Sequence, residues 1–187
     1  MTQDLVQHAE RYATSAHRRI DQRRKYTDQP YDAHLRAVVE IVETVTGDPE
    51  LLAAAWLHDT LEDTPATYDD IEREFGTEVA DLVAELTDVS RASDGNRAVR
   101  KSIDRAHLAR ASSRAKTVKL ADLIDNCRDI MRHDERFART YVTEAAGLLE
   151  VLHDGDPTLF ARAGKLVRRS AEQLGLPAPR QPVMAVE

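Results

Sequence analysis

The chain has 187 residues, of which 42% are hydrophobic and 32% are charged, and it contains 7 Gly and 7 Pro. That length suits a single domain, and so few Gly and Pro disfavour an all-β fold with many tight turns. The formal net charge of −7 at pH 7 disfavours a protein that coats nucleic acid. Cys127 is the only cysteine, which excludes an internal disulfide and is typical of a reducing compartment. The sequence shows neither an apolar run of about 18 residues nor a signal-peptide core, so we expect a cytoplasmic protein that does not bind membranes.

Charged residues are grouped along the chain in three blocks. Residues 11–36 hold seven Arg and Lys against three acids, and residues 48–88 hold thirteen acids against Arg73 alone. Residues 91–139 reverse the balance, with thirteen Arg and Lys against seven acids. An acidic centre between basic flanks can hold a cation and meet a phosphorylated ligand from either side. Such blocks also arise on the solvated faces of ordinary helical proteins, so both interpretations stay open.

Apolar residues recur at helical spacing through most of the chain, and no stretch shows the alternation typical of a strand. Asp48-Pro49 is typical of a helix start, and the helix that follows is apolar nearly all round, which predicts central burial. Thr67 and Gly76 are expected to bound a short helix. The predicted helices cover residues 3–21, 35–45, 49 to about 64, 68–75, 77–86, 97–111, 114–132, 135–153 and 157–173. The sequence therefore predicts an all-α fold, with one compact multi-helix domain over residues 1–175 and a flexible tail over 176–187.

Four ionisable residues stand together where the most apolar helix is expected to end: His58, Asp59, Glu62 and Asp63. Burial of such groups without partners is costly, so we expect something to compensate them, and a divalent cation is one candidate. Glu62 follows His58 by one helical turn, and Asp63 follows Asp59 in the same way. This second pair of carboxylates could hold an attacking water or protonate a leaving group. A helix-end histidine paired with its acidic neighbour is the simpler alternative for His58-Asp59.

Two further residues fit the same chemistry. His34 lies at the start of the second predicted helix, and Asp122 lies one turn before Asn126 on the same helical face. Two histidines and two carboxylates form a mixed nitrogen and oxygen set, which suits Mn²⁺, Fe²⁺, Co²⁺ or Zn²⁺ and leaves positions open for water. Taken singly, His34 is also typical of a capping or surface histidine, and Asp122 of a helix-surface acid.

The order and spacing of His34, His58-Asp59 and Asp122 resemble those of the HD-domain metal-dependent phosphohydrolases. Further motifs resemble the hydrolase domain of the RelA/SpoT group, namely His17-Arg18, Arg23-Arg24-Lys25, Pro30-Tyr31-x-x-His34, Ala53 to Thr64, and Val118-Lys119-Leu120-Ala121-Asp122-x-x-x-Asn126. The resemblance covers about residues 5–170 of the chain. Because 187 residues leave no room for a synthetase beside a hydrolase, the chain is similar to a stand-alone small alarmone hydrolase of the Mesh1 type.

The resemblance implies a role for each matching residue. One catalytic ion, usually Mn²⁺ in this family, would be ligated by His34, His58, Asp59 and Asp122. The acid–base pair would be Glu62 and Asp63. The residues implied or expected to contact the nucleotide are Arg24, Lys25, Lys119, Asn126 and Tyr141. The implied reaction removes the 3′-pyrophosphate of ppGpp or pppGpp, giving GDP or GTP and pyrophosphate.

Several of the basic residues allow more than one interpretation. Lys119 stands three residues before Asp122 and could tune that carboxylate or Glu62 instead of binding phosphate. Lys116 and Arg128 lie on the same predicted helix and could add positive charge for the phosphates. A solvated surface role is the alternative for each of them.

Two other functions stay open. The same fold and metal site could act on ppApp or on the 2′-phosphate of NADPH, because the stretch Thr87 to Arg91 departs from the family pattern in a turn that orders the site. A catalytically silent regulator that binds the nucleotide is the other alternative, although no ligand and neither acid of the pair is missing. The oligomeric state stays undecided, since apolar helices over 135–173 could complete the core or form a dimer face.

Overall fold

The computed structural model describes residues 2–177, and among these the secondary structure is helical apart from turns and an isolated β-bridge between Arg23 and Pro30. The predicted all-α class is therefore confirmed. The helices in chain order are α1 (Thr2–Arg19), α2 (Asp32–Glu43), α3 (Pro49–Leu57), α4 (Thr60–Asp63), α5 (Tyr68–Phe75), α6 (Thr77–Leu86), the 3-10 turn η1 (Ala92–Asp94), α7 (Arg97–Leu108), α8 (Ser113–His133), α9 (Glu135–Leu149) and α10 (Pro157–Gln173). None of the helices in this described part is long and apolar enough to cross a bilayer.

The chain divides into two compact units, residues 1–88 and residues 89–187. The first holds α1 to α6 and the second holds η1 and α7 to α10. Most of the expected tail, from residue 178 onward, lies outside the described residues. The sequence-based division into a domain over 1–175 and a flexible tail over 176–187 thus stays a prediction.

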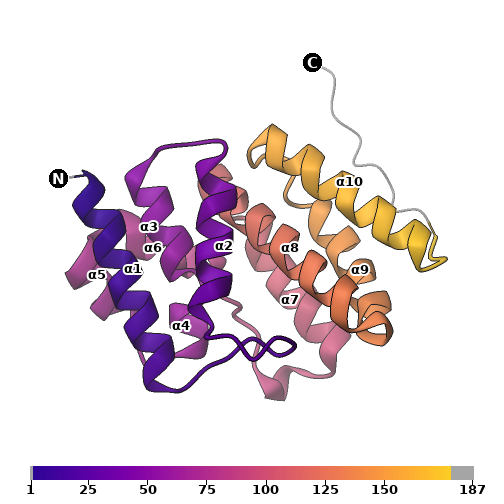
Figure 1. The fold of residues 1–187 in the computed structure, drawn as a ribbon, viewed down its shortest axis with the longest axis horizontal. Coiled ribbons are helices and arrows are strands. Elements are labelled where there is room, and N and C mark those ends of the chain that lie inside the picture. The colour runs from indigo at the N-terminus through magenta and orange to yellow at the C-terminus, as the bar shows by residue number, and fades with distance from the viewer. Residues whose placement is uncertain (1, 178–187) are drawn as a thin grey trace. The chain divides into compact units, whose positions relative to one another are not determined.

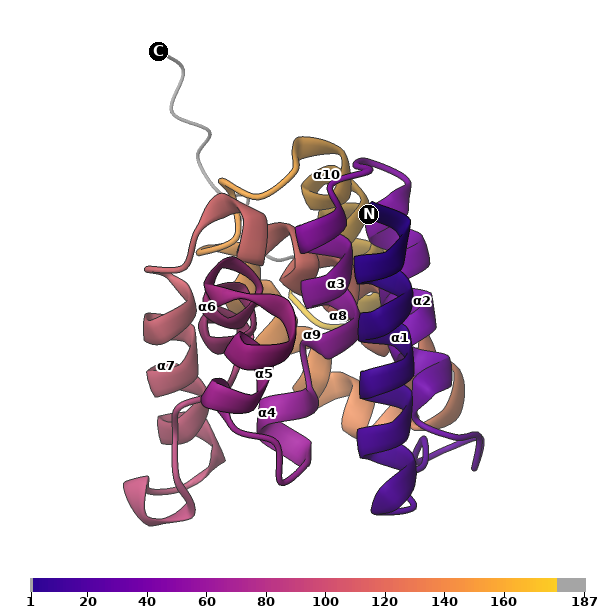
Figure 2. The same cartoon turned by 90° about the vertical axis from the view of Figure 1, so that its left-hand side faces the viewer.

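The first unit is built around α3, whose residues from Leu51 to Leu57 are all buried. Helices α1, α2 and α6 pack against α3, and α5 packs against α6 (Figures 1 and 2). Small side chains allow close approach, since Ala9 and Ala13 of α1 are as fully buried as Ala54 of α3. The central burial predicted from a helix that is apolar nearly all round is confirmed.

The helix predicted from Pro49 to about Thr64 is interrupted, and this part of the prediction is wrong. Helix α3 ends at Leu57, and the short helix α4 begins at Thr60 after Asp59, whose φ of −99° and ψ of 0° leave the helical range. The His58 ring forms a hydrogen bond with the Ala55 carbonyl, in which Nδ1 lies 2.8 Å from the carbonyl oxygen. In an unbroken helix the same carbonyl would accept the backbone N–H of Asp59, so the side chain competes with the helix.

Local capping explains the other helix boundaries of the first unit. The Asp48 carboxylate accepts hydrogen bonds from the backbone N–H groups of the next turn, as the Asp48-Pro49 pair predicts. Thr67 and Asp70 form a reciprocal capping box at the start of α5. Gly76 ends α5 and precedes α6 with a φ of 86°, a backbone conformation that favours glycine. These boundaries agree with those predicted from sequence.

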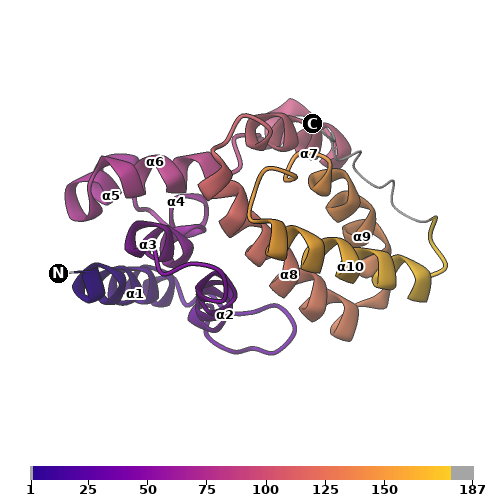
Figure 3. The same cartoon turned by 90° about the horizontal axis from the view of Figure 1, so that it is seen from above.

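The second unit is organised by α8, which buries Val118, Leu120, Ala121 and Ile124 completely. Helices α9 and α10 pack against α8 and against each other, and α7 packs against α9 (Figure 3). The predicted helices over this region are confirmed, although α7 and α9 end earlier than expected, at Leu108 and Leu149.

A buried carboxylate orders the beginning of the second unit. Asp104, on α7, is only 7% exposed. Its Oδ1 accepts the backbone N–H groups of Val89 at 3.0 Å and Ser90 at 2.8 Å, and its Oδ2 accepts the Ser90 hydroxyl at 2.9 Å. Three hydrogen bonds satisfy this buried acid and fix the backbone at Val89 and Ser90.

Candidate metal and catalytic site

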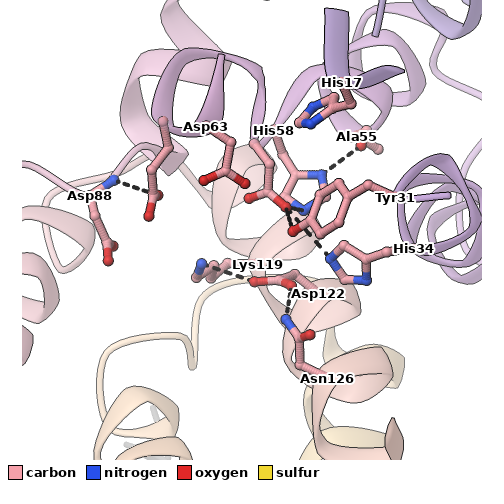
Figure 4. A network of polar contacts seen from close by, with 12 residues as sticks. His17, Tyr31, His34, Ala55, His58, Asp63, Asp88, Lys119, Asp122 and Asn126 are labelled. Atoms are coloured by element: carbon pink, nitrogen blue, oxygen red, sulfur yellow. Dashed lines mark hydrogen bonds and ion pairs between the residues drawn. The ribbon is translucent and has the colours of Figure 1, made fainter. Parts of the chain in front are cut away.

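Three predicted metal ligands come together in the first unit. His34 lies in the first turn of α2, His58 follows α3, and Asp59 precedes α4. One ligand atom from each of them lies within 4.8 Å of the others (Figure 4). The Oδ2 atom of Asp59 is 3.1 Å from Nε2 of His58 and 3.7 Å from Nε2 of His34. The break between α3 and α4 is what lets the adjacent residues His58 and Asp59 face one point.

The chemistry of these side chains fits a divalent cation. Both imidazoles are almost completely buried, with His34 at 1% and His58 at 2% exposure. Because the Ala55 carbonyl can only accept a hydrogen bond, His58 carries a proton on Nδ1, and Nε2, which faces Asp59, is the ring nitrogen that could coordinate an ion. Two buried imidazole nitrogens around one carboxylate oxygen form a donor set typical of Zn²⁺, Mn²⁺, Fe²⁺ or Co²⁺. The residues present thus fit the metal that the sequence predicts.

Tyr31 fixes the carboxylate of this group. Its hydroxyl donates to Oδ2 of Asp59 at 2.6 Å, and its ring lies 5.4 Å from the His34 ring. The His34 ring in turn lies 5.3 Å from the His58 ring. A bond from a neighbouring hydroxyl orients a ligating carboxylate before an ion arrives.

Glu62 and Asp63, the predicted acid–base pair, occupy the last two positions of α4 and are both exposed. Oε2 of Glu62 lies 3.4 Å from the backbone nitrogen of Asp88. Oδ2 of Asp63 accepts a hydrogen bond from the Gln22 side chain at 2.8 Å. Partial desolvation raises the pKa of Asp63, the Gln22 hydrogen bond opposes that rise, and the nearby Asp59 charge adds to it. Both carboxylates are therefore open to solvent, as proton exchange requires.

Arg24 and Lys25, two predicted nucleotide contacts, lie on the loop between α1 and α2. The loop closes through the Arg23–Pro30 bridge and through the Arg24 backbone N–H, which donates to the Gln29 carbonyl at 2.9 Å. The exposed Lys25 places its ammonium 4.9 Å from the centre of the Tyr26 ring. This hairpin-like loop presents two cations from a fixed backbone, which suits an anionic ligand.

The remaining predicted site residues lie in the second unit. On α8, Oδ2 of Asp122 is 2.9 Å from the Lys119 ammonium, and the Asn126 amide donates to Oδ1 of the same carboxylate (Figure 4). Asp122 is only 6% exposed, so these two neighbours hold it in one orientation. The ion pair agrees with the alternative role of Lys119 as a partner of Asp122, and the assignment of Lys119 as a nucleotide contact stays a prediction. The assignment of Asp122 as the fourth ligand stays a prediction.

Two other residues of the second unit, Tyr141 and Lys116, were considered as groups that meet the nucleotide or its phosphates. Tyr141, on α9, has a pKa raised well above its usual range by burial, and the Asp122 charge adds to this effect. The assignment of Tyr141 as a nucleotide contact stays a prediction. Lys116 is buried and donates to Asp154 at 2.8 Å and to the Ala109 carbonyl at 3.0 Å. Its charge stabilises the second unit, so the expectation that it meets phosphates is wrong.

Three residues with no predicted role lie around the acids: His17, Gln22 and Tyr31. His17 and Tyr31 belong to motifs that carry the family resemblance, and those motifs could have indicated that both residues lie near the site. Gln22 is neither charged nor part of a quoted motif, so nothing in the sequence alone indicated it.

Comparisons with known proteins identify the family of the chain. A family model described as HD domain matches residues 9–151, which span both units. The chain is 42% identical over 122 residues to the guanosine-3′,5′-bis(diphosphate) 3′-pyrophosphohydrolase MESH1 of Drosophila melanogaster, covering 64% of this chain and 65% of that protein. It is 38% identical over 131 residues to the protein of the same name in Xenopus tropicalis, covering 68% of this chain and 70% of that one.

A solved structure gives the same result for the fold. It is described as a metazoan orthologue of SpoT that hydrolyses ppGpp and plays a role in starvation responses. The two chains are 33% identical and superpose with a TM-score of 0.79, over 91% of this chain and 96% of that one. The sequence alignment with the fly relative, by contrast, spans slightly less than two thirds of that protein's length, at 65%.

Proposed function

The chain belongs to the HD-domain family, in the branch that holds the MESH1 and SpoT hydrolases, and from this membership we propose that it hydrolyses ppGpp and pppGpp. The products are GDP or GTP and pyrophosphate. The observation that carries the proposal is the group of two buried histidines, His34 and His58, with Asp59, because its ligand atoms already lie within 4.8 Å of one another. The substrate class comes from the activity for which the relatives are named.

The resident ion is proposed to be a single Mn²⁺, with Fe²⁺, Co²⁺ or Zn²⁺ as possible replacements in the same donor set. His34, His58 and Asp59 would hold it, and the resemblance of the α8 motif adds Asp122 as the fourth ligand. Such an ion lowers the pKa of bound water and offsets charge on a phosphoryl group.

The protein's own acids then handle the protons. Water adds to the phosphorus atom attached to the ribose O3′, the bond between that phosphorus and O3′ breaks, and O3′ leaves with a proton. Glu62 and Asp63, which are exposed at the end of α4, would orient the water and carry protons between it and O3′. Their position beside, rather than within, the group of buried ligands keeps them available for this exchange.

The substrate carries several negative charges, which the basic residues would neutralise. Arg24 and Lys25 would flank the base and phosphates from the loop after α1. Asn126 and Tyr141 would contact the ribose region, and Lys119 would act through its ion pair with Asp122. The acidic block at 48–88 and its basic flanks thereby serve different parts of one reaction.

Product analysis tests the proposal directly. The purified chain loaded with Mn²⁺ is incubated in turn with ppGpp, pppGpp, ppApp and NADPH, and products are separated by ion exchange. We expect GDP and pyrophosphate from ppGpp, with loss of turnover in Asp59→Ala and Glu62→Ala. Orthophosphate release from NADPH alone would instead assign a 2′-phosphatase, and nucleotide binding without turnover would assign a regulator.

A further inference from the structure

A buried histidine outside the proposed ligand set contacts a glutamine of the following loop. His17, near the end of α1, has no exposed surface. Its Nδ1 lies 2.6 Å from Oε1 of Gln22. Because an amide oxygen only accepts hydrogen bonds, His17 carries its proton on Nδ1 and donates it to Gln22.

The backbone around Gln22 is held by the same neighbours. The Gln22 N–H donates to the His17 carbonyl at 3.1 Å, and the Gln22 carbonyl accepts the N–H of Tyr31 at 3.1 Å. The rings of His17 and Tyr31 are stacked, with centroids 5.0 Å apart. Gln22 is thus fixed at both main-chain groups and at its side-chain oxygen, which leaves its amide little freedom to rotate.

The fixed amide points its nitrogen at one of the proposed catalytic acids. With Oε1 turned to His17, Nε2 of Gln22 faces Asp63 and donates to Oδ2 at 2.8 Å. Among the residues that the structure describes, Gln22 is the side chain that hydrogen-bonds the Asp63 carboxylate. Asp63 is exposed, so without this bond its side chain would sample several rotamers.

We propose that His17 and Gln22 are a pair of positioning residues, in which the His17 imidazole sets the Gln22 amide and the amide holds the Asp63 carboxylate in the orientation for proton transfer. This inference rests on the proposed function, because it assigns the pair to the same acid–base step. Two neighbouring residues then have different roles: Gln22 orients Asp63, whereas Tyr31, whose ring stacks on His17, orients Asp59. A misplacement of about 1 Å in a reacting group can lower a rate about 100-fold, so a bond of this kind affects turnover.

Gln22→Met is the first test, since methionine keeps the length of the side chain and removes both hydrogen bonds. We expect kcat for ppGpp to fall about tenfold or more, with KM within about twofold and the same amount of bound Mn²⁺ as the wild type. Gln7→Met, an equal change at an exposed position of α1, is the matched control and retains wild-type kcat. Wild-type kcat in Gln22→Met would overturn the proposal, and so would a rise in KM alone, which would assign Gln22 to the nucleotide loop.

A double-mutant cycle shows whether Gln22 acts through Asp63. In the Asp63→Asn background, the further change Gln22→Met should lower kcat by less than about twofold, because the group that it orients is already impaired. An equal fold-loss in both backgrounds would contradict the proposed relay.

Two variants of His17 test the first member of the pair. His17→Asn places an amide N–H close to the position of Nδ1 and should retain most of the turnover. His17→Leu fills the buried space without a donor and should show the same loss of kcat as Gln22→Met, with thermal unfolding used to compare the folded state of both. Equal activity of the two variants would contradict a role for the His17 N–H.

One readout does not depend on hydrolysis. Crystal structures of the wild type and Gln22→Met should differ in the orientation of the Asp63 carboxylate, and an unchanged carboxylate refutes the positioning role. If the wild type released no pyrophosphate from ppGpp, the proposed function would fail. A wild type that hydrolyses ppGpp and is indifferent to Gln22 would refute the positioning pair alone.

Discussion

The Tyr31 hydroxyl donates a 2.6 Å hydrogen bond to the same Asp59 oxygen that faces the Nε2 atoms of both His34 and His58. Removing the hydroxyl leaves all three ligand side chains present but frees the Asp59 carboxylate to rotate. We expect Tyr31→Phe to weaken Mn²⁺ binding by about 10-fold to 100-fold, the range typical of residues that orient a ligand. Competition with a chromophoric chelator measures the affinity.

The matched control for this change is Tyr68→Phe. The Tyr68 hydroxyl also donates to a carboxylate, that of Asp81 at 2.6 Å, on an exposed part of the same unit. Its loss should leave Mn²⁺ affinity unchanged. An unchanged affinity in Tyr31→Phe as well would show that Asp59 needs no orienting partner.

Glu62 and Asp63 are expected to affect turnover and not metal loading. The variants Glu62→Gln and Asp63→Asn keep the size of each side chain and remove its ability to exchange a proton. We expect kcat to fall by about 10²-fold to 10⁴-fold in each, with Mn²⁺ content by elemental analysis equal to the wild type. Glu172→Gln, at an exposed position of α10, is the control. Loss of the ion in either variant would reassign that residue as a ligand.

Charge reversal at Arg24 separates binding from chemistry. Because we propose that Arg24 binds the anionic substrate and takes no part in the chemistry, Arg24→Glu should raise KM for ppGpp about tenfold or more and change kcat by less than about threefold. The control is Arg11→Glu, which reverses a charge on the exposed face of α1. Steady-state kinetics in the presence of Mn²⁺ measure both constants. An unaltered KM in Arg24→Glu would show that Arg24 does not bind the nucleotide.

The buried Asp104 is expected to contribute to stability. Its replacement by alanine leaves the N–H groups of Val89 and Ser90 without the carboxylate that accepts them. We expect Asp104→Ala to lower the free energy of unfolding by about 2 kcal/mol, measured by urea denaturation. Asp104→Asn retains one acceptor oxygen and should cost less. Equal stability of wild type and Asp104→Ala would show that water replaces the carboxylate.

Asp70 gives a dependence of stability on pH. Its hydrogen bonds from Thr67 and Arg73 lower the pKa from 3.8 to about 2. Because the folded-state pKa lies below the unfolded value, the ionised carboxylate stabilises the fold above pH 3.8, and this contribution is lost as the pH falls toward 2. The thermal midpoints of wild type and Asp70→Asn should therefore differ most near neutral pH and converge near pH 2.

The control for this measurement is Asp69→Asn, which removes a neighbouring exposed charge from the same turn of α5. Its difference from the wild type should not show the same convergence near pH 2. A gap between wild type and Asp70→Asn that stays constant over the whole range would assign the effect to shape and not to ionisation.

Helix positions followed from sequence because their signals are local. The Asp48 cap, the Thr67 capping box and Gly76 act over a single turn, so the boundaries of α3 at its start, of α5 and of α6 were predictable. The end of α3 was not predictable, because a hydrophobic pattern does not show that the His58 side chain will hydrogen-bond the Ala55 carbonyl. That one hydrogen bond changed a continuous helix into α3 and α4.

The sequence by itself determined the helical class, the family, and the residues with the right chemistry for a metal and an acid–base pair. It could do so because apolar periodicity, caps and ligand types are properties of short segments. Only the tertiary structure decided which of these side chains face each other. It brought His34 of α2 to the break after α3, and it turned Gln22 toward Asp63 and Tyr31 toward Asp59. Such contacts join residues 25 to 41 positions apart and depend on how the helices pack, which no local pattern encodes.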